Sequence, residues 1–134
     1  MTKLYQMAIE AAKGAYAPYS KFRVGAALLC DDGTVYTGCN IENAAYSVTV
    51  CAERVALFTA VAAGKRKFSA IAVCGGTDGD FTSPCPPCGV CRQALWEFCD
   101  SDMPVILADG EGGVAEHKLC DLLPLGFDKS KMGD

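Results

Sequence analysis

The sequence has no long hydrophobic run and no strong excess of charge of either sign. No apolar stretch approaches the roughly 18 residues that a membrane-spanning helix needs, so no membrane partner is expected. Twelve basic residues stand against sixteen acidic ones, a formal net charge of −4. Proteins that bind nucleic-acid phosphates present a basic face, so a nucleic-acid partner is not expected either. The composition favours a small-molecule substrate.

Internal repeats, low-complexity tracts and linkers are also missing. The first residues turn polar and acidic by Glu10, which does not fit a secretory signal peptide, and we expect a cytoplasmic protein. With 51% hydrophobic and 21% charged residues, the composition is typical of a folded chain rather than a disordered one. We expect a single domain over residues 1–134.

Histidine is nearly absent, whereas cysteine is abundant, with nine residues in the chain. An odd number of cysteines without a secretory signal argues against a disulfide scaffold and favours core residues, metal ligands or catalytic groups. Cys30, Cys74 and Cys99 lie in apolar runs and are predicted to be core residues. The single histidine, His117, lies in a late polar segment and is predicted to be a surface residue.

The spacing of apolar residues predicts alternating strands and helices. The helix expected at 52–63 should bury Val55, Phe58 and Ala62. A continuous apolar run at 68–74 is typical of a strand covered on both faces. The other expected helices are 3–16 and 89–99, and the other expected strands are 23–30, 34–39, 104–108 and a short one after the turn at 110–113. This order predicts an α/β fold, a three-layer α-β-α sandwich around a mixed five-stranded sheet.

Two cysteine-bearing segments begin predicted helices: CAER at 51–54 and CGVCRQ at 88–93. A helix N-terminus favours the thiolate, the form of cysteine that binds a metal. Three thiolates suit zinc and leave a fourth tetrahedral position open for water. Glu53 stands two residues after the first cysteine, where a carboxylate can move the protons of that water. The predicted metal ligands are Cys51, Cys88 and Cys91.

Five segments in register resemble the small zinc-dependent cytidine deaminases. Zinc deaminases combine an H-x-E segment, with cysteine replacing histidine in some members, and a later P-C-x-x-C segment. The matching segments here are YSKF with VGAA at 19–27, GCNIEN at 38–43, CAER at 51–54, CGVCRQ at 88–93 and LLP at 122–124. The resemblance runs from about residue 10 to 127. It implies a cytidine deaminase-like fold, one zinc ion per subunit and a homotetramer with pockets shared between subunits.

The resemblance also implies an activity: hydrolytic deamination of cytidine and 2′-deoxycytidine, a step of pyrimidine salvage. Zinc-bound hydroxide would attack C4 of the base, and Glu53 would be the proton shuttle. The substrate-binding residues that it implies are Phe22 for the base, Asn40 and Glu42 for the ribose hydroxyls, Ala52 through its backbone, and Tyr46 and Phe127 from neighbouring subunits.

Two arginines follow the ligand segments closely. Three thiolates exceed the charge of zinc, which weakens the metal as a Lewis acid. Arg54 and Arg92 are expected to donate hydrogen bonds to the thiolate sulfurs and so to offset that negative charge.

Cys85 leaves a second interpretation of the ligand segment open, because PCPPC at 84–88 also fits P-C-x-x-C. Cys85, Cys88 and Cys91 together have the spacing of an iron–sulfur loop, but Leu95 stands where that motif needs a fourth cysteine. A structural zinc site, with Cys39 or Cys85 as the fourth ligand, is another alternative. The roles of Cys85 and of VTV at 48–50 stay open.

The substrate side has alternatives as well. Phe22 could be an ordinary core residue, and Asn40 and Glu42 could be turn or cap residues. Within the same reaction class, the substrate could be another cytosine-bearing small molecule. Outside it, the chain could be a non-catalytic zinc-binding module. A polynucleotide substrate is disfavoured by the net charge of −4 and the lack of a basic stripe.

Overall fold

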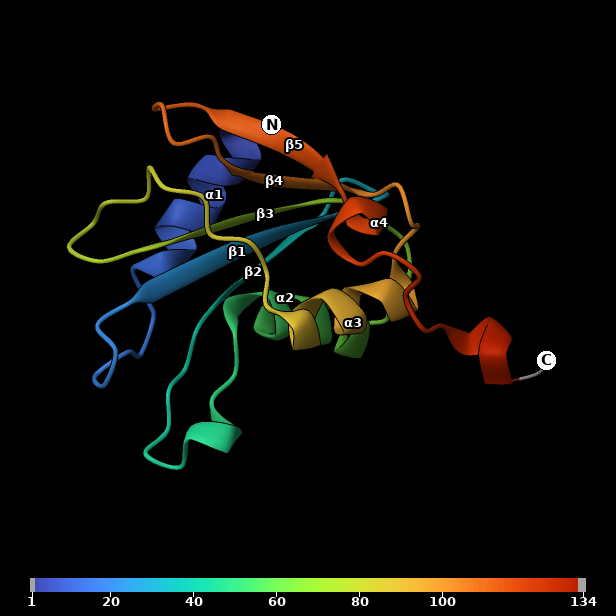
Figure 1. Ribbon diagram of the computed structural model, residues 1–134, viewed down its shortest axis with the longest axis horizontal. Helices are drawn as coiled ribbons and strands as arrows, with labels where there is room; N and C mark the ends of the chain where they lie inside the picture. The colour runs from blue at the N-terminus through green and yellow to red at the C-terminus, as the bar shows by residue number, and fades with distance from the viewer. Residues whose placement is uncertain (1, 133–134) are drawn as a thin grey trace.

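A five-stranded sheet lies between two layers of helices in the computed structural model, which describes residues 2–132 (Figure 1). The strands are β1 (Arg23–Cys30), β2 (Val35–Cys39), β3 (Phe68–Gly76), β4 (Pro104–Ala108) and β5 (Val114–Lys118). Their order across the sheet is β2-β1-β3-β4-β5. Strands β3 and β4 pair in parallel and the other neighbours pair antiparallel. The mixed five-stranded α/β fold predicted from the sequence is confirmed.

Four α-helices and two short 3₁₀ helices complete the described part of the chain. They are α1 (Thr2–Ala12), η1 (Tyr46–Val48), α2 (Ala52–Ala62), α3 (Gly89–Phe98), α4 (Leu119–Leu122) and η2 (Lys129–Met132). Within residues 2–132, every helix is too short or too polar to cross a bilayer.

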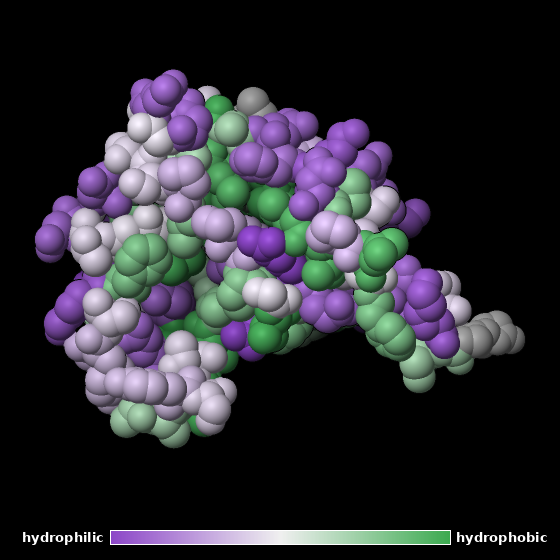
Figure 2. All heavy atoms as spheres, viewed as in Figure 1, coloured by the Kyte–Doolittle hydropathy of each residue, from purple (hydrophilic) through white to green (hydrophobic). Residues whose placement is uncertain are grey.

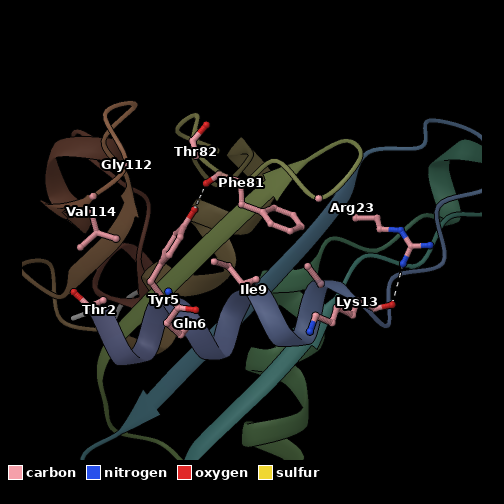
Figure 3. Close-up of a pocket in the computed structure, with 13 residues that line it drawn as sticks. Thr2, Tyr5, Gln6, Ile9, Lys13, Arg23, Phe81, Thr82, Gly112 and Val114 are labelled. Atoms are coloured by element: carbon pink, nitrogen blue, oxygen red, sulfur yellow. Dashed lines mark hydrogen bonds between the residues drawn. The ribbon is translucent and has the colours of Figure 1, made fainter.

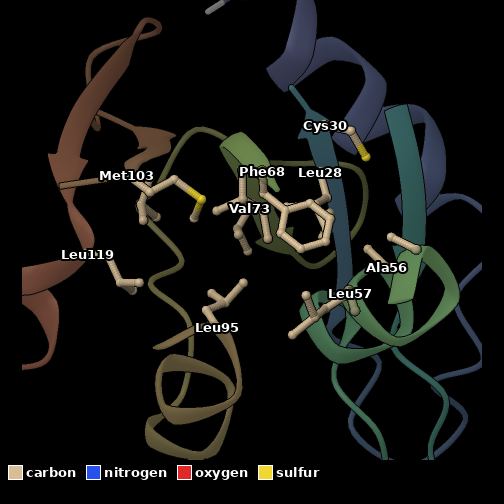
Figure 4. Packing of buried hydrophobic residues seen from close by; sticks show 14 of the residues in the cluster. Leu28, Cys30, Ala56, Leu57, Phe68, Val73, Leu95, Met103 and Leu119 are labelled. Carbon is tan, nitrogen blue, oxygen red and sulfur yellow. The ribbon is translucent and has the colours of Figure 1, made fainter. Parts of the chain in front are cut away.

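Strand β3 separates two hydrophobic cores because successive side chains of a strand point to opposite faces. Ile71 and Val73 point toward α2 and α3, in the cluster that also holds Leu28, Leu57 and Leu95 (Figure 4). The alternate residues of β3, Ala70, Ala72 and Cys74, point toward α1. Burial on both faces explains why this strand is a continuous apolar run in the sequence.

The core assignments of the cysteines follow this division. Cys30 and Cys74 are fully buried, as predicted. Cys99 is half-buried and packs against the α2/α3 core. His117 lies on β5 with its side chain exposed, as predicted.

Helix α1 is shorter than the sequence predicted, because it ends at Ala12 rather than continuing to residue 16. The backbone of Tyr16 pairs with the segment after β2 instead of continuing the helix. Its N–H donates to the carbonyl of Asn40, and its carbonyl accepts from the N–H of Glu42. This pairing is incompatible with a helical Tyr16, so the chain leaves the helix well before Pro18.

Helix α2 buries a different face from the one expected. Its inward residues are Ala52, Glu53, Ala56, Leu57 and Ala60. The expectation for Phe58 and Ala62 was wrong, since both are exposed, and Val55 is only half-buried. The buried face is dominated by small residues because α2 packs tightly on β2: a Cβ added to Gly38 would lie 2.5 Å from the carbonyl oxygen of Ala52.

Two segments extend away from the body of the molecule (Figure 1). One joins β2 to α2 and carries η1; the other is the C-terminal segment after α4. In the space-filling view, the surface is hollowed between the body and the η1 segment (Figure 2). Both segments carry aromatic side chains in solvent, with Tyr46 75% and Phe127 58% exposed.

Candidate active site

The sulfur atoms of Cys51, Cys88 and Cys91 all lie within 4.8 Å of one another. The Sγ atoms of Cys51 and Cys88 are 3.7 Å apart. Cys91 is buried, Cys51 is half-buried and Cys88 is exposed, so the cluster reaches from the core to the surface. The fold therefore brings together the three cysteines that the sequence singled out as metal ligands.

Each ligand segment starts a helix because its first cysteine is the N-cap. Cys51 precedes α2 and Cys88 precedes α3, both with extended backbone. The sulfur of Cys88 accepts a hydrogen bond of 3.4 Å from the N–H of Cys91. Both cap cysteines thus lie at the positive end of a helix dipole, which stabilises negative charge on their sulfurs.

The thiols also interact with one another. A hydrogen bond from the thiol of Cys91 is the largest cause that lowers the pKa of Cys51 to about 5, and the guanidinium of Arg54 contributes. Donating that hydrogen bond, together with burial, raises the pKa of Cys91.

Glu53 is a carboxylate with almost no access to water, since only 3% of its surface is exposed. Among the buried side-chain atoms of residues 2–132, Oε1 of Glu53 and Nε of Arg54 are the two without a hydrogen-bond partner. Burial, and next to it the charge of Cys51, raises the pKa of Glu53 to about 7. A carboxyl group in this state can both accept and donate a proton near neutral pH.

The two arginines behave differently. Nη2 of Arg54 donates to Sγ of Cys51 over 3.6 Å, the kind of contact that the sequence led us to expect. Arg92 instead donates from Nε to the carbonyl of Pro87 at 2.7 Å and from Nη1 to the carbonyl of Leu122 at 2.6 Å. The side chain of Arg92 therefore joins the ligand loop to the last residue of α4, and its hydrogen bonds go to carbonyl oxygens rather than to a sulfur.

Asn40 is buried at the end of β2 and fixes the backbone around Phe22. Its Nδ2 donates to the carbonyl of Phe22, and its Oδ1 accepts from the N–H of Val24, both at 2.9 Å. A side-chain amide offers two donors and two acceptor lone pairs. One donor and one acceptor of Asn40 therefore remain for another partner.

Glu42 organises the turn that precedes Phe22. Its Oε1 accepts from the backbone N–H groups of Tyr19 and Ser20, at 3.0 and 3.1 Å, and its Oε2 accepts from the hydroxyl of Ser20. These hydrogen bonds, that of the Ser20 hydroxyl first, lower the pKa of Glu42. Glu42, Tyr19 and Ser20 also line a cavity of about 290 Å³ together with Tyr46 and Thr49.

The remaining candidates lie at different depths. Ala52 is fully buried in the first turn of α2, whereas 39% of Phe22 is exposed. Tyr46 and Phe127 lie on the two extended segments and are largely exposed, and the Tyr46 ring packs edge-on against that of Tyr19 with ring centroids 6.3 Å apart. The carbonyl of Phe127 accepts a hydrogen bond of 2.7 Å from Gln93 of α3.

Comparisons with known proteins agree with this geometry. Residues 1–107 match the family described as the cytidine and deoxycytidylate deaminase zinc-binding region. The cytidine deaminase of Sporosarcina psychrophila is 52% identical over 130 residues, covering 97% of this chain and 93% of that protein. The cytidine deaminase of Halalkalibacterium halodurans is 49% identical over 131 residues, covering 98% and 96%.

The chain belongs to the cytidine deaminase family. Solved structures of the family share its fold. The crystal structure of the Burkholderia pseudomallei cytidine deaminase has a TM-score of 0.85 at 48% identity, covering 94% of this chain and 98% of that one. The Mycobacterium tuberculosis cytidine deaminase has a TM-score of 0.80 at 41% identity, covering 94% and 95%. The protein is a zinc-dependent hydrolytic deaminase of this family.

The donor set of this family member fits zinc. Two sulfurs bound to a tetrahedral zinc ion at about 2.3 Å are about 3.8 Å apart, close to the 3.7 Å between Cys51 and Cys88. Thiolates suit zinc, and three of them leave one coordination position open. The unpartnered Oε1 of the buried Glu53 marks a polar atom whose partner would be a bound molecule.

Cys85 lies close to this cluster without joining it, since the group of sulfurs within 4.8 Å consists of Cys51, Cys88 and Cys91. Burial is the main cause that raises the pKa of the Cys85 thiol to about 11, and the charges of Glu53 and Cys51 add to it. The geometry favours the frame of the motif that begins at Pro87 and Cys88 over the frame that begins at Pro84 and Cys85. The spacing of Cys85 in the sequence raised it as a candidate ligand, but the sequence could not show which residues it would lie beside in the fold.

A second cavity, of about 500 Å³, lies beside α1 on the other face of the sheet (Figure 3). Its lining includes Tyr5, whose hydroxyl donates to the carbonyl of Phe81 at 2.7 Å, and Arg23, which donates to the carbonyl of Lys13 at 2.9 Å. None of the residues that the family resemblance assigns to the reaction lines this cavity. The reaction is therefore assigned to the cysteine cluster.

Proposed function

We propose that this protein hydrolyses cytidine and 2′-deoxycytidine to uridine and 2′-deoxyuridine, with release of ammonia. The observation that carries the proposal is the buried carboxylate of Glu53, with a free Oε1, next to three sulfurs at the start of α2 and α3. A non-catalytic zinc module would not explain a buried carboxylate without a partner, because such a group destabilises the fold.

Cys51, Cys88 and Cys91 would hold one zinc ion per subunit. When bound, zinc supplies Lewis acidity that lowers the pKa of a water molecule toward neutrality. Oε1 of Glu53 takes a proton from the attacking water and passes it to N3 of the base. The same carboxylate then takes the proton of the new C4 hydroxyl and passes it to the C4 amino group, which leaves as ammonia while the C4–O bond becomes the carbonyl of uracil. Burial is the main cause that raises the pKa of Glu53, which favours a carboxyl group that can return the proton it takes up.

Arg54 offsets part of the negative charge of the three thiolates through its contact with Cys51. Without such a contact, the excess charge would oppose ionisation of the water. Arg92 supports the site differently, because it fixes the carbonyl of Pro87 just before the ligand Cys88.

The substrate would bind against the 19–24 segment. The ring of Phe22 would pack on the pyrimidine, and the buried amide of Ala52 would face the base. The unused donor and acceptor of Asn40, and the carboxylate of Glu42, would take the ribose hydroxyls. A free nucleoside fits these contacts better than a polynucleotide, because its 3′- and 5′-hydroxyls are free to be bound. Within a polynucleotide these hydroxyls are esterified to phosphate.

We further propose that the enzyme is a cytoplasmic homotetramer in pyrimidine salvage, with each pocket completed by Tyr46 and Phe127 of neighbouring subunits. Exposed aromatic residues on two extended segments support contacts with other copies. Nine free cysteines suit a reducing compartment. Co-expression of Glu53→Gln and Phe127→Ala chains tests the shared pocket: mixed tetramers should regain activity, and no recovery would contradict it.

The activity is tested by the ultraviolet spectrum of cytidine mixed with the zinc-loaded protein. We expect a shift to the uridine spectrum that a chelator abolishes, and the same for 2′-deoxycytidine. Single-stranded oligonucleotides containing cytosine should stay unchanged. Zinc-loaded protein that leaves both nucleosides intact would contradict the proposed substrates, and other cytosine-bearing small molecules, such as nucleoside antibiotics, would then be tested.

A further inference from the structure

Cys85 lies in the loop between β3 and α3, three residues before the ligand Cys88. Its side chain is half-buried although it is outside the sulfur cluster. The proposed reaction does not use this thiol.

The sulfur of Cys85 and the ring of Phe22 both lie against the backbone of Gly75, near the end of β3. A Cβ added to Gly75 would be 2.5 Å from Sγ of Cys85 and 2.8 Å from Cε2 of Phe22. Both distances are shorter than real Cβ contacts, so a side chain at position 75 would push the sulfur or the ring aside. The end of β3, the sulfur of Cys85 and the edge of the Phe22 ring therefore lie next to one another.

The backbone of Phe22 is fixed from the other direction. Its carbonyl accepts from Asn40 and its N–H donates to the hydroxyl of Ser20, both at 2.9 Å. These bonds place the Cα of Phe22, but they leave the side-chain torsions free. Gly75 lies beneath the ring edge and the sulfur of Cys85 lies beside the same point, so the strand backbone and the sulfur restrict the direction of the ring.

We propose that Cys85 and Gly75 are positioning residues for Phe22, holding its ring in the orientation that packs on the pyrimidine. This inference rests on the proposed function, in which Phe22 contacts the base. Sulfur suits the position because it is polarisable and contacts ring edges favourably. Burial raises the pKa of the Cys85 thiol, which favours its neutral form, so it acts as an apolar support.

The first test is Cys85→Ala, measured with cytidine as substrate. Sulfur–aromatic contacts contribute about 0.3–1.5 kcal/mol, so KM should rise about two- to tenfold, with kcat within about twofold. The zinc content should equal that of the unmodified protein. Cys85→Val, which refills the space with an apolar side chain, should restore KM. Cys120→Ala removes a half-buried thiol far from Phe22 and should leave KM unchanged.

A double-mutant cycle shows whether Cys85 acts through Phe22. In a Phe22→Ala background, Cys85→Ala should cause no further rise in KM. Gly75→Ala should raise KM more than Cys85→Ala, and combining the two should recover part of the loss, since removing the sulfur frees space beside the new Cβ. Thermal unfolding of each variant checks that it is folded at the assay temperature.

The outcomes separate the two proposals. If Phe22→Ala leaves the KM for cytidine unchanged, the role of Phe22 in the proposed function is wrong. If Phe22→Ala raises KM but Cys85→Ala does not, only the positioning inference is overturned. Loss of zinc from Cys85→Ala would also overturn it, because Cys85 would then support the metal rather than the ring.

Discussion

Nη2 of Arg54 lies 3.6 Å from Sγ of Cys51, so a guanidinium from the first turn of α2 contacts the sulfur that caps the same helix. Residues three apart in sequence meet here because the cap and the first turn face each other. The contact places a positive charge beside a thiolate cluster that carries more negative charge than a zinc ion can neutralise.

Arg54→Gln should therefore weaken zinc binding. Loss of a partner that hydrogen-bonds a metal ligand costs about 10- to 100-fold in metal affinity, and we expect the Kd for zinc to rise by that factor. Competition with a chromogenic chelator measures it. Arg66→Gln is the matched control, because Arg66 is exposed and donates only to the carbonyls of Val61 and Lys65 among the described residues. Equal zinc affinity in both variants would remove Arg54 from the metal site.

Gly25→Ala should destabilise the fold, because α1 passes directly over β1 at this residue. An added Cβ would lie 2.0 Å from the carbonyl oxygen of Ala8 and 2.7 Å from the nitrogen of Ala12, so the helix must move. We expect a loss of about 3 kcal/mol or more in the free energy of unfolding, measured by urea denaturation. Gly14→Ala, whose Cβ makes ordinary contacts of 3.6 Å or longer, should stay within about 1 kcal/mol of the unmodified protein. Equal losses would mean that this close approach is absent.

Stability should fall as the pH rises above about 9. Burial is the main cause that raises the pKa of Tyr5 to about 12 from 10.0, and the pKa values of Cys74 and Cys99 to about 12 from 9.0. Because the folded state holds these protons more tightly, the stabilisation is complete below the ordinary pKa values. It is lost as the pH rises from those values toward 12.

Thermal unfolding between pH 8 and pH 11 measures this loss. Tyr5→Phe should lower Tm at pH 8, since the hydrogen bond to Phe81 is lost. Above pH 10, its Tm should fall less steeply than that of the unmodified protein, because one titrating group is gone. Parallel curves for the two proteins would show that Tyr5 ionises as easily in the folded state as in the unfolded one.

The strands were the most predictable part of the fold. The run at 68–74 is apolar except for Ser69, and that pattern is typical of a strand covered on both faces. The cysteine cluster could be predicted equally well from the sequence, because each ligand segment starts a helix and the spacing of Cys88 and Cys91 places both on one turn.

Side-chain directions were harder to predict. In α2, alanine and the larger apolar residues are spread around the helix, so the sequence could not show that small residues face Gly38 while Phe58 is exposed. Arg92 follows a ligand directly, but one step along a helix turns the side chain by about 100°, toward Leu122 rather than the sulfurs. Cys85 and Phe22 approach the backbone of Gly75 from positions 63 residues apart in the sequence, and no local pattern encodes this arrangement.

Comparing Glu53→Gln with the unmodified protein, both loaded with zinc, is the most direct test of the central claim. Gln keeps the size of the side chain but cannot take up and return a proton at neutral pH. We predict unchanged zinc content and a fall in kcat for cytidine of at least about 100-fold, the lower range for general acid–base catalysis. Turnover by Glu53→Gln near that of the unmodified protein would contradict the assignment of Glu53 as the group that moves the proton.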